Sequence, residues 1–481
     1  MTKKKSKEGL SAKKEENFSE WYQQLIIKSE LADYTDVSGC IVFRPTAFGI
    51  WEKIRDEADK RFKKIGIQNV YFPLLIPEPF LSKEQKHLKG FSPEVAWVTE
   101  AGKTKLNERL AIRPTSEAIM YPSYSKWIRS WRDLPLKYNQ WNNVIRWEFK
   151  NPIPFLRTRE FLWNEGHTVF ATKREAEKEA MPIINIYKKI LEEYMAIPNL
   201  IGKKTDKEKF AGAEYTITLE CYLPNGKVVQ GPDFHHDGQN FSKAYNIQFK
   251  DEKGEEQYAW QNTWAISTRM LGIMFALHSD NKGLIIPPKI APNKIVIIPI
   301  KFEKDKKILN EVKEILKTLS KYNTILDDRT EITPGYKFNE WELKGIPIRI
   351  EIGPNDLAKK EVVIVRRDNG KKISVKIKNL KKEIDRELED MQKSLFRKAS
   401  NLLQTALDKS ETLKDAIKKI KEKKIVLVPL KNSVEVEDIL KEKTGGAKTL
   451  NRPLKQPQIK GKKCIVSGKP ADYWVYVGKS Y

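Results

Sequence analysis

The stretch RWEFKNPIPFLRTREFLWNEGH, residues 146–167, places arginines on both sides of a proline-rich turn. Asn151-Pro152-Ile153-Pro154 predicts the turn, and the flanking residues predict a strand before it and another after it. Alternation along a strand puts Arg146 and Glu148 on one face, and Arg157 and Arg159 on one face. Planar guanidinium groups at such a hairpin suit the oxygens of a triphosphate or a carboxylate. A surface hairpin with Arg–Glu pairs, each contributing about 0–1 kcal/mol, explains the same spacing.

Around this hairpin, residues 17–285 predict one domain of helices and strands. Gly49–Gly66 has apolar residues at helical spacing, and Gly66 is suited to end that helix. Val70–Pro77 predicts a buried strand that proline stops. The other expected elements are strands at 108–114, 137–150, 157–171, 213–222 and 241–249, an amphipathic helix at 173–196 and a buried apolar helix at 259–280.

After a proline-stiffened linker at Ile285–Pro292, the pattern changes to alternating strands and helices. This alternation predicts a compact α/β domain over residues 286–385. Charged helices within 380–422 and a strand-rich end at 423–481 predict a small C-terminal module, residues 386–481. The Lys/Glu-rich residues 1–16 predict a disordered basic tail. The predicted fold class is therefore α/β overall, with an α+β domain first.

The chain is strongly basic, and its charge is unevenly distributed. Its 481 residues hold 89 Lys and Arg against 64 Asp and Glu, a net charge of +25. Residues 291–481 carry +17 of this and the first 290 residues +8. A polyanionic partner and a general lysine-rich composition explain the excess equally well. With only three scattered cysteines, no long apolar segment and no secretory signal, we expect a cytoplasmic protein without membrane contact.

Three further groups of residues are candidates for chemistry. Arg113-Pro114-Thr115-Ser116-Glu117 precedes an apolar helix, where capping is the simpler role. Gln230–Gln239 is dense in polar residues, but its neighbouring histidines should face opposite sides of a strand. Ser267-Thr268-Arg269 puts an arginine in an apolar run, where it needs a partner. The chain has no Walker A loop, His-Glu-x-x-His or Cys-x-x-Cys motif, which argues against metal-hydrolase and thiol chemistry.

Residues 146–167, Arg113–Glu117 and Gly283–Pro288 together closely resemble the prolyl-tRNA synthetase family of class II synthetases, in its archaeal/eukaryote-like form. Gly335–Pro347 is similar to the family's anticodon domain, and Val477–Tyr481 to its C-terminal tyrosine tail. The resemblance implies an antiparallel catalytic sheet flanked by helices, an α/β anticodon-binding domain and a small α+β C-terminal module. It also implies a proline--tRNA ligase that activates L-proline with ATP and Mg²⁺ and transfers it to tRNA(Pro).

The resemblance also assigns residues. Arg146 and Arg269 match the catalytic arginines, and Pro73 matches a proline at a homodimer interface. The implied ATP-binding residues are Arg146, Glu148, Arg157, Thr158, Gln230, Asp233, Ser267 and Arg269, with Mg²⁺ held through the phosphates near Gln230. The implied proline-binding residues are Thr115, Glu117, Arg146, Phe161, Trp163, His167, His235 and Ser267. Lys337, Glu340, Trp341 and Arg349 are the candidates for anticodon binding.

The sequence departs from the family pattern in three places. Asp233-Phe234 replaces Thr-Ser, and a carboxylate there would repel phosphate unless a metal ion bridges them. Of the four cysteines that hold zinc in many relatives only Cys464 remains, and Lys431, Val436 and Val466 fill the positions where the others would be expected, so we predict no structural zinc. His167 and Thr268 lie too close in sequence to enclose the large editing insertion of bacterial-type enzymes. Two alternatives stay open: a catalytically inactive tRNA-binding paralogue, and another class II synthetase.

Overall fold

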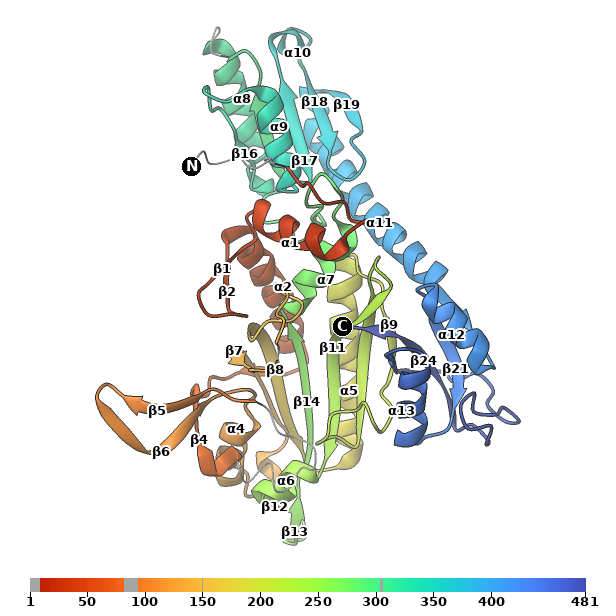
Figure 1. Ribbon diagram of the computed structural model, residues 1–481. Coiled ribbons are helices and arrows are strands. Elements are labelled where there is room, and N and C mark those ends of the chain that lie inside the picture. The colour runs from red at the N-terminus through yellow and green to blue at the C-terminus, as the bar shows by residue number, and fades with distance from the viewer. Residues whose placement is uncertain (1–8, 82–93, 149, 303–305) are drawn as a thin grey trace.

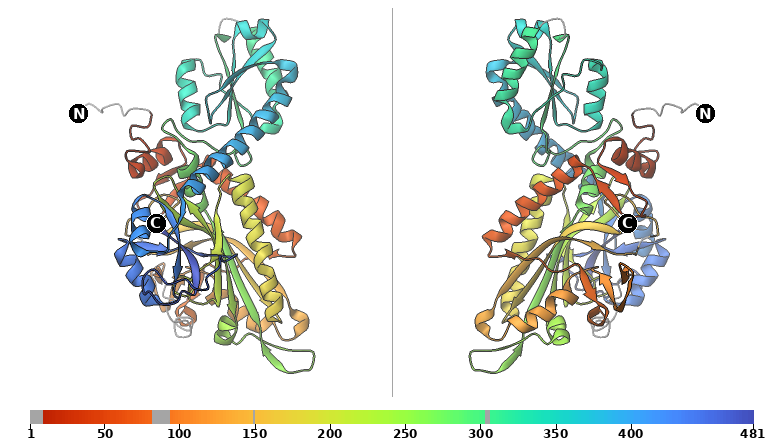
Figure 2. Two further views of the ribbon diagram at one scale, coloured as in Figure 1. Left: turned by 90° about the vertical axis from the view of Figure 1, so that its right-hand side faces the viewer. Right: turned by 90° about the vertical axis from the view of Figure 1, so that its left-hand side faces the viewer.

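A computed structural model describes residues 9–81, 94–148, 150–302 and 306–481 (Figure 1). A large sheet with helices on both sides forms the body of the molecule. A smaller α/β domain stands at one end of this body, and the long helix α11 (Leu380–Ala406) runs from it along the body (Figure 2). The C-terminal residues return to the side of the large sheet, close to its middle strands (Figure 1). The predicted fold class is confirmed.

The large sheet positions the candidate site. Its main path runs in the order β20-β21-β24-β11-β14-β8-β7-β3, and neighbouring strands from β11 to β7 are antiparallel. These strands span β3 (Gln68–Asn69), β7 (Leu136–Ile145), β8 (Glu160–Phe170), β11 (Lys227–Gly238), β14 (Trp260–Ser267), β20 (Leu407–Lys409), β21 (Ile425–Leu430) and β24 (Tyr473–Ser480). Four more strands join its side: β9 (Leu200–Lys203), β10 (Tyr215–Tyr222), β22 (Ala447–Thr449) and β23 (Arg452–Pro453).

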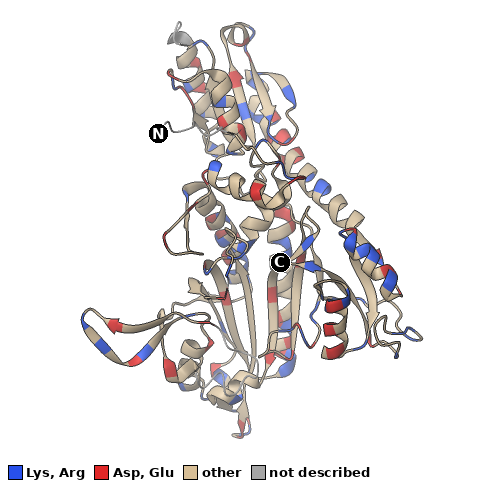
Figure 3. Ribbon diagram, in the orientation of Figure 1, with Lys and Arg blue, Asp and Glu red and all other residues tan. Residues whose placement is uncertain are grey.

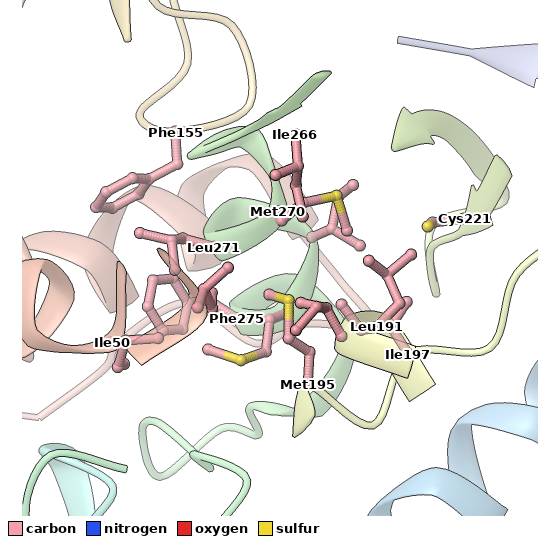
Figure 4. Close-up of a cluster of buried hydrophobic side chains, with 14 of the residues drawn as sticks. Ile50, Phe155, Leu191, Met195, Ile197, Cys221, Ile266, Met270, Leu271 and Phe275 are labelled. Carbon is pink, nitrogen blue, oxygen red and sulfur yellow. The ribbon is translucent and has the colours of Figure 1, made fainter. Parts of the chain in front are cut away.

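One face of this sheet is covered by apolar helices. They are α1 (Phe18–Lys28), α2 (Pro45–Lys64), α5 (Lys173–Lys189), which continues as a π-helical turn at Ile190–Tyr194, and α7 (Arg269–His278). Figure 4 shows side chains from α2, α7 and the end of α5 meeting in this core. Helix α2 buries Ile50, Ile54 and Phe62, as its spacing predicts. Gly66 follows α2 at a φ of +83°, a backbone conformation that suits glycine after a helix end.

The opposite side carries smaller elements around the site. Helix α4 (Glu117–Trp127) lies there with α6 (Asn240–Tyr245) and the hairpin of β12 (Gln248–Lys250) and β13 (Glu256–Tyr258). A separate sheet has the order β4-β6-β5, from β4 (Leu75–Pro77), β5 (Trp97–Ala101) and β6 (Thr104–Ile112). The short pair β1 (Ala32–Tyr34) and β2 (Ile41–Phe43) completes the N-terminal part. Short 3₁₀ helices lie at Trp131–Asp133, Ser320–Tyr322 and Ile377–Asn379.

The α/β domain is a five-stranded mixed sheet, as the alternating pattern predicts. Its order is β16-β15-β17-β18-β19, with parallel pairing around β15 and antiparallel pairing beyond β17. Its elements are β15 (Ile295–Pro299), α8 (Lys306–Thr318), β16 (Ile325–Leu326), α9 (Pro334–Leu343), β17 (Ile348–Ile352), α10 (Pro354–Ala358), β18 (Glu361–Arg366) and β19 (Lys372–Lys376).

The C-terminal part packs α12 (Leu413–Lys421) and α13 (Val434–Lys443) on β21 and β24. It is continuous with the catalytic sheet, because β24 pairs with β21 along Tyr473–Val477 and, in parallel, with the start of β11 at Lys479 and Ser480. The sequence pattern predicts a separate module here, and no local feature of the sequence indicates that β24 pairs with β11.

Three sequence predictions of secondary structure are wrong in part. Residues 259–280 are not one helix: β14 precedes α7, and both are buried, so apolar content alone could not distinguish them. The strand expected at 241–249 is mostly α6, which ends at Asn246 with a φ of +56°. The strand expected at Val70–Pro77 forms only at Leu75–Pro77, and the segment is partly exposed: Tyr71 is 73% exposed, whereas Phe72 and Ile76 are buried.

The start of the chain also differs from the expected disordered tail. Residues 1–8 lie outside the described residues, but the following residues contact the body. The Lys14 ammonium donates hydrogen bonds to the carbonyls of Leu277 (3.2 Å) and Ser279 (2.7 Å) at the end of α7. Burial lowers the pKa of Lys14 to about 8. This lysine therefore caps a core helix and does not belong to a freely solvated segment.

Candidate active site

A cavity of about 800 Å³ opens over strands β8, β11 and β14. All the site residues that the resemblance implies in the catalytic domain line it, except Arg157 and Thr158, which line two smaller adjoining cavities. Strand alternation explains the grouping, since Phe161, Trp163, Glu165 and His167 occupy every second position of β8. The volume of the main cavity is in the usual range for small-molecule sites, roughly 300–1,000 Å³.

One end of the cavity is a buried polar network around the start of α4. Thr115 donates a short hydrogen bond to Glu117, and Ser116 donates one to Glu165. Glu165 also accepts from Asn142 (2.7 Å) and lies 3.3 Å from His167 Nε2. Burial would raise the pKa of Glu165, but hydrogen bonds from His167 and Ser116 outweigh it and lower the pKa. The network leaves Thr115 and Glu117 at the cavity wall as a small acidic site.

The ionisation of His167 follows from the same network. Burial lowers its pKa, yet the hydrogen bond with Glu165 and the charges of Glu117 and Glu165 raise it overall above the ordinary value. Its other ring nitrogen, Nδ1, lies 3.1 Å from the hydroxyl of Tyr121. Both ring nitrogens are therefore fixed, and the ring is held as a rigid wall of this end of the cavity.

Arg146 lines the cavity next to the Thr115–Glu117 site and is held without an acidic partner. Its Nε donates to the carbonyl of Pro114 (2.9 Å), and its guanidinium lies over the rings of Phe161 (5.5 Å) and Trp163 (5.3 Å). The indole of Trp163 is in turn fixed by Asn142 (2.6 Å). In the described part of the chain no carboxylate forms an ion pair with Arg146, so its charge is available to an anionic ligand.

Arg269 lies where three cavities meet. It lines the main cavity and both smaller ones, of about 190 and 50 Å³. Its Nε donates to the carbonyl of Leu156 (3.3 Å). Burial lowers the pKa of Arg269 most, and the charges of Arg146 and Arg157 lower it further. The partner that an arginine needs in this apolar run is therefore a backbone carbonyl, and the cluster of like charges favours a polyanion.

Strand β11 supplies the remaining polar wall. Gln230 donates its amide to Asp233 (2.9 Å), and His235 Nε2 lies 3.5 Å from the other Asp233 oxygen. His235 Nδ1 lies 2.8 Å from the Thr216 hydroxyl. His236 points to the opposite face, where its ring stacks on Trp260, as alternation predicts. Burial lowers the pKa of His235, so the ring is neutral near pH 7.

Comparison with known proteins identifies the family. Residues 97–278 match the tRNA synthetase class II core domain (G, H, P, S and T), residues 294–387 the anticodon binding domain, and residues 413–481 the C-terminal domain of prolyl-tRNA synthetase. The whole chain is 45% identical to the cytoplasmic proline--tRNA ligase of Arabidopsis thaliana and covers 92% of it.

The chain belongs to the prolyl-tRNA synthetase family.

Other relatives agree. A proline--tRNA ligase of Ruminiclostridium cellulolyticum is 46% identical, with 97% of both chains covered. The bifunctional glutamate/proline--tRNA ligase of Cricetulus griseus is 45% identical over the whole chain, which spans 33% of that larger protein.

The described residues include no group of three or more His, Cys, Asp or Glu side chains that converge on one point. Asp233 Oδ1 is buried and has no hydrogen-bond partner among them. A single carboxylate oxygen fits Mg²⁺ that is bound mainly through phosphates and water.

In the C-terminal module, Cys464 lies in an apolar core with Val436 and Val466, which occupy positions of expected cysteines. The lack of a structural zinc ion stays a prediction.

The four anticodon candidates are engaged inside their own domain. Lys337 is 1% exposed and donates to the carbonyl of Asp327 (3.1 Å), and Trp341 donates to the Asp327 carboxylate (2.8 Å). Glu340 pairs with Arg329 (2.7 Å). Arg349 pairs with Glu351 (2.9 Å). These contacts give the four side chains structural roles, which the sequence pattern did not indicate.

Several lining residues were not among those that the sequence suggested. Glu165, Phe210, Thr216 and Thr263 line the main cavity, as does the segment 206–211. Glu165 had a usable signal, because it shares the face of Trp163 and His167 in a strand. Phe210 and Thr216 had none, since only the folding of residues 204–216 against β11 brings them to the cavity.

Proposed function

We propose that this chain is a proline--tRNA ligase that activates L-proline with ATP and transfers the prolyl group to tRNA(Pro). The observation that supports this most directly is the position of Arg146. It lies between the acidic site at Thr115 and Glu117 and the cationic end at Arg269, and backbone anchoring leaves its charge uncompensated. A guanidinium there suits both a carboxylate and the α-phosphate that the carboxylate attacks.

The proposed first step joins proline to the α-phosphate of ATP. Glu117, supported by Thr115, receives the secondary ammonium of proline, and Phe161, Trp163, His167 and His235 enclose the ring. A proline carboxylate oxygen attacks the α-phosphate, and the bond from that phosphorus to the bridging oxygen breaks. The carboxylate is already an anion at neutral pH, so this step needs positioning and charge stabilisation but no general base.

The ATP side of the site is proposed on the cavities around Arg269. Phe155, Thr158 and Ser267 line the small cavity of about 50 Å³ beside Arg146 and Arg269, and the planar guanidinium of Arg269 suits stacking on the adenine ring. Glu148 lines both this cavity and the main one. Mg²⁺ neutralises phosphate charge when it is bound, and Asp233 next to Gln230 is the residue that would contact it.

Further features belong to the proposal. The exposed apolar side chains of Tyr71, Leu74 and Leu75 flank Pro73 and support a homodimer interface.

No helix of the described residues is long and apolar enough to cross a membrane. The cytoplasmic Arabidopsis relative supports placement in the cytoplasm. The linker near residue 286 supports the domain division 17–285, 286–385 and 386–481.

Proline-dependent exchange of labelled pyrophosphate into ATP tests the first step, and prolylation of a tRNA(Pro) transcript tests the second. Proline should support exchange, whereas threonine, glycine and histidine should not. Absence of proline-dependent exchange would favour an inactive tRNA-binding paralogue, and exchange with another amino acid would favour a different class II synthetase. Sedimentation analysis should give twice the mass of the 55.9 kDa chain.

A further inference from the structure

The segment 206–211, which lines the main cavity, begins at a residue that the C-terminal module holds. This residue is Thr205, which is fully buried. Its carbonyl accepts the amide of Lys209 (2.9 Å), so the segment turns over Thr205 as it enters the cavity wall. The side chain of Thr205 points away from this turn, to helix α13 of the C-terminal module.

A buried hydrogen-bond network around Glu437 joins the two parts. Glu437 lies in the first turn of α13 and is 5% exposed. One of its carboxylate oxygens, Oε2, accepts from the hydroxyl of Thr205 (3.0 Å) and also from the hydroxyl of Thr449. Burial raises the pKa of Glu437, and the hydrogen bonds from Thr449 and Thr205 offset part of that rise. The carboxylate therefore binds both hydroxyl groups strongly, because little water competes for it.

Two contacts near the surface surround this network. Asn432 donates a hydrogen bond to the carboxylate of Asp206, and Lys207 forms an ion pair with Asp438. The side chain of Asp438 is 60% exposed. Exposed ion pairs contribute little to stability, so the buried Glu437 contact is the stronger of the connections.

At its other end the segment places Phe210 against the proposed proline site. The ring centres of Phe210 and His235 are 4.9 Å apart. The Phe210 amide donates to the Thr216 hydroxyl (3.1 Å), which lies 2.8 Å from His235 Nδ1. Since the Thr216 oxygen accepts from the amide, its own hydrogen is free to donate to Nδ1. The ring hydrogen of neutral His235 is then on Nε2, the nitrogen 3.5 Å from Asp233.

The two ends of the segment are thus held by different parts of the molecule. The C-terminal module holds the end at Thr205, and the catalytic strands β10 and β11 hold the end at Phe210. Few residues separate the two ends, so a displacement at Thr205 is passed to the Phe210 ring. Loss of the Glu437 contact would therefore change how His235 is packed.

We propose that Glu437 of the C-terminal module is a positioning residue for proline recognition, which holds Thr205 and thereby places Phe210 against His235. The inference rests on the proposed function, because it takes His235 as part of the proline site. Among the described residues that line the main cavity Glu437 is absent, so it acts through the segment 206–211 and not by touching a substrate.

The test is the KM for proline in pyrophosphate exchange, measured with full-length Glu437→Ala and Glu435→Ala. Glu435 is exposed in the same first turn of α13, so its variant controls for the charge at this helix end. We expect Glu437→Ala to raise the KM for proline about tenfold, because small displacements at a substrate site are costly. The KM for ATP should change by less than about threefold. A loss of folded protein alone would lower the rate and leave the KM for proline unchanged.

Thr205→Val tests the same contact from the catalytic side. Valine keeps nearly the shape of threonine but lacks the hydroxyl, so the KM for proline should rise, whereas Thr205→Ser should keep it near the value of the unchanged chain. Combining Thr205→Val with Glu437→Ala should raise the KM no further than Glu437→Ala alone, because both changes remove one contact.

Equal KM values for proline in Glu437→Ala and Glu435→Ala would overturn the inference, as would equal rises in the KM for proline and for ATP. If Glu437→Ala does not fold, Thr205→Val decides, and a KM for proline equal to that of Thr205→Ser would overturn the inference. Failure of the unchanged chain to show any proline-dependent exchange would instead refute the proposed function.

Discussion

The arginines of the catalytic cleft and those of the anticodon-binding domain have different partners. In the cleft, Arg146 and Arg269 are anchored by the carbonyls of Pro114 and Leu156. In the anticodon-binding domain, Arg329 forms two hydrogen bonds with Asp327 (2.8 and 2.7 Å). Figure 3 shows acidic and basic residues interspersed over that domain. A carbonyl fixes the position of a guanidinium but leaves its charge, whereas a carboxylate also neutralises it.

The comparison separates binding arginines from structural ones. An arginine that only backbone carbonyls hold in a cavity can still bind a phosphate. An arginine that already forms two hydrogen bonds with a carboxylate contributes mainly to folding. The pairing of arginines with carboxylates also explains why this basic domain has few uncompensated positive charges near Asp327. The excess charge of residues 291–481 must therefore act through exposed lysines, whose phosphate contacts add affinity without sequence specificity.

Arg146→Ala should have the largest effect. It removes the uncompensated charge between the proposed carboxylate and phosphate positions, so we expect proline-dependent pyrophosphate exchange to fall by about a thousandfold or more. Arg329→Ala, measured as exchange per folded molecule, should stay within about threefold of the unchanged chain. Near-normal exchange in Arg146→Ala would refute both its assigned role and the distinction between carbonyl-held and carboxylate-held arginines.

Asp327→Ala should have the next largest effect, on stability. It removes the acceptor of the Trp341 indole and the carboxylate that lies 3.7 Å from the buried Lys337 ammonium, and we expect a loss of about 3 kcal/mol from the anticodon-binding domain. Hydrogen exchange of β15 and β17, followed by mass spectrometry, measures this locally. Asp328→Ala, the exposed neighbour, is the matched control. Equal protection in the two variants would show that the Asp327 network is dispensable.

The same carboxylate gives a dependence on pH. Burial would raise the pKa of Asp327, but hydrogen bonds from Arg329 and Trp341 and the charge of Lys337 lower it to about 2. A folded-state pKa below the ordinary value of roughly 3.9 means that this stabilisation is complete above pH 4 and is lost as pH falls toward 2. Protection of β15 in Asp327→Asn should therefore vary less over this interval than in the unchanged chain.

Glu165→Gln should have the smallest effect of the set. Its carboxylate keeps the pKa of His167 above the usual value, so the pair stabilises below pH 6.5 and loses this contribution as pH rises through the folded-state pKa. We expect the pKa of His167 to fall in the variant, because the hydrogen bond and the charge of Glu165 both raise it in the unchanged chain. Titration of the ring carbon signals by NMR measures it. His278, whose pKa burial lowers to about 4, is the internal control. An unchanged His167 would contradict the network.

Much of the site could be predicted because it depends on local periodicity. The family resemblance assigned Phe161, Trp163 and His167 to the site, and the two-residue alternation of β8 explains why they share one face. Helical spacing identified the buried face of α2. The resemblance also assigned Arg146 and Arg269 to one site, although 123 positions of chain separate them. The shared face of β8 and the buried face of α2 could be predicted because each is fixed by the geometry of a single strand or helix.

Other features could not be predicted, because they depend on which elements meet. The apolar run 259–280 supplies both a central strand and a buried helix, and only burial on both faces of the sheet selects the strand for β14. Lys337 looks like a solvated helix residue until β16 and α9 enclose it against Asp327. Gln230 looks available for a ligand until the fold places Asp233 within hydrogen-bonding distance.

By itself the sequence determined the domain order, the basic character of the second half and the residue types of the catalytic strands, since composition and spacing are local properties. Only the tertiary structure decided which charges remain uncompensated and which cavity the C-terminal strand completes. The physical reason is that charge neutralisation and strand pairing act between residues that are distant in the chain. Lys448 lies far from Arg269 in sequence, and β24 brings the two to one cavity.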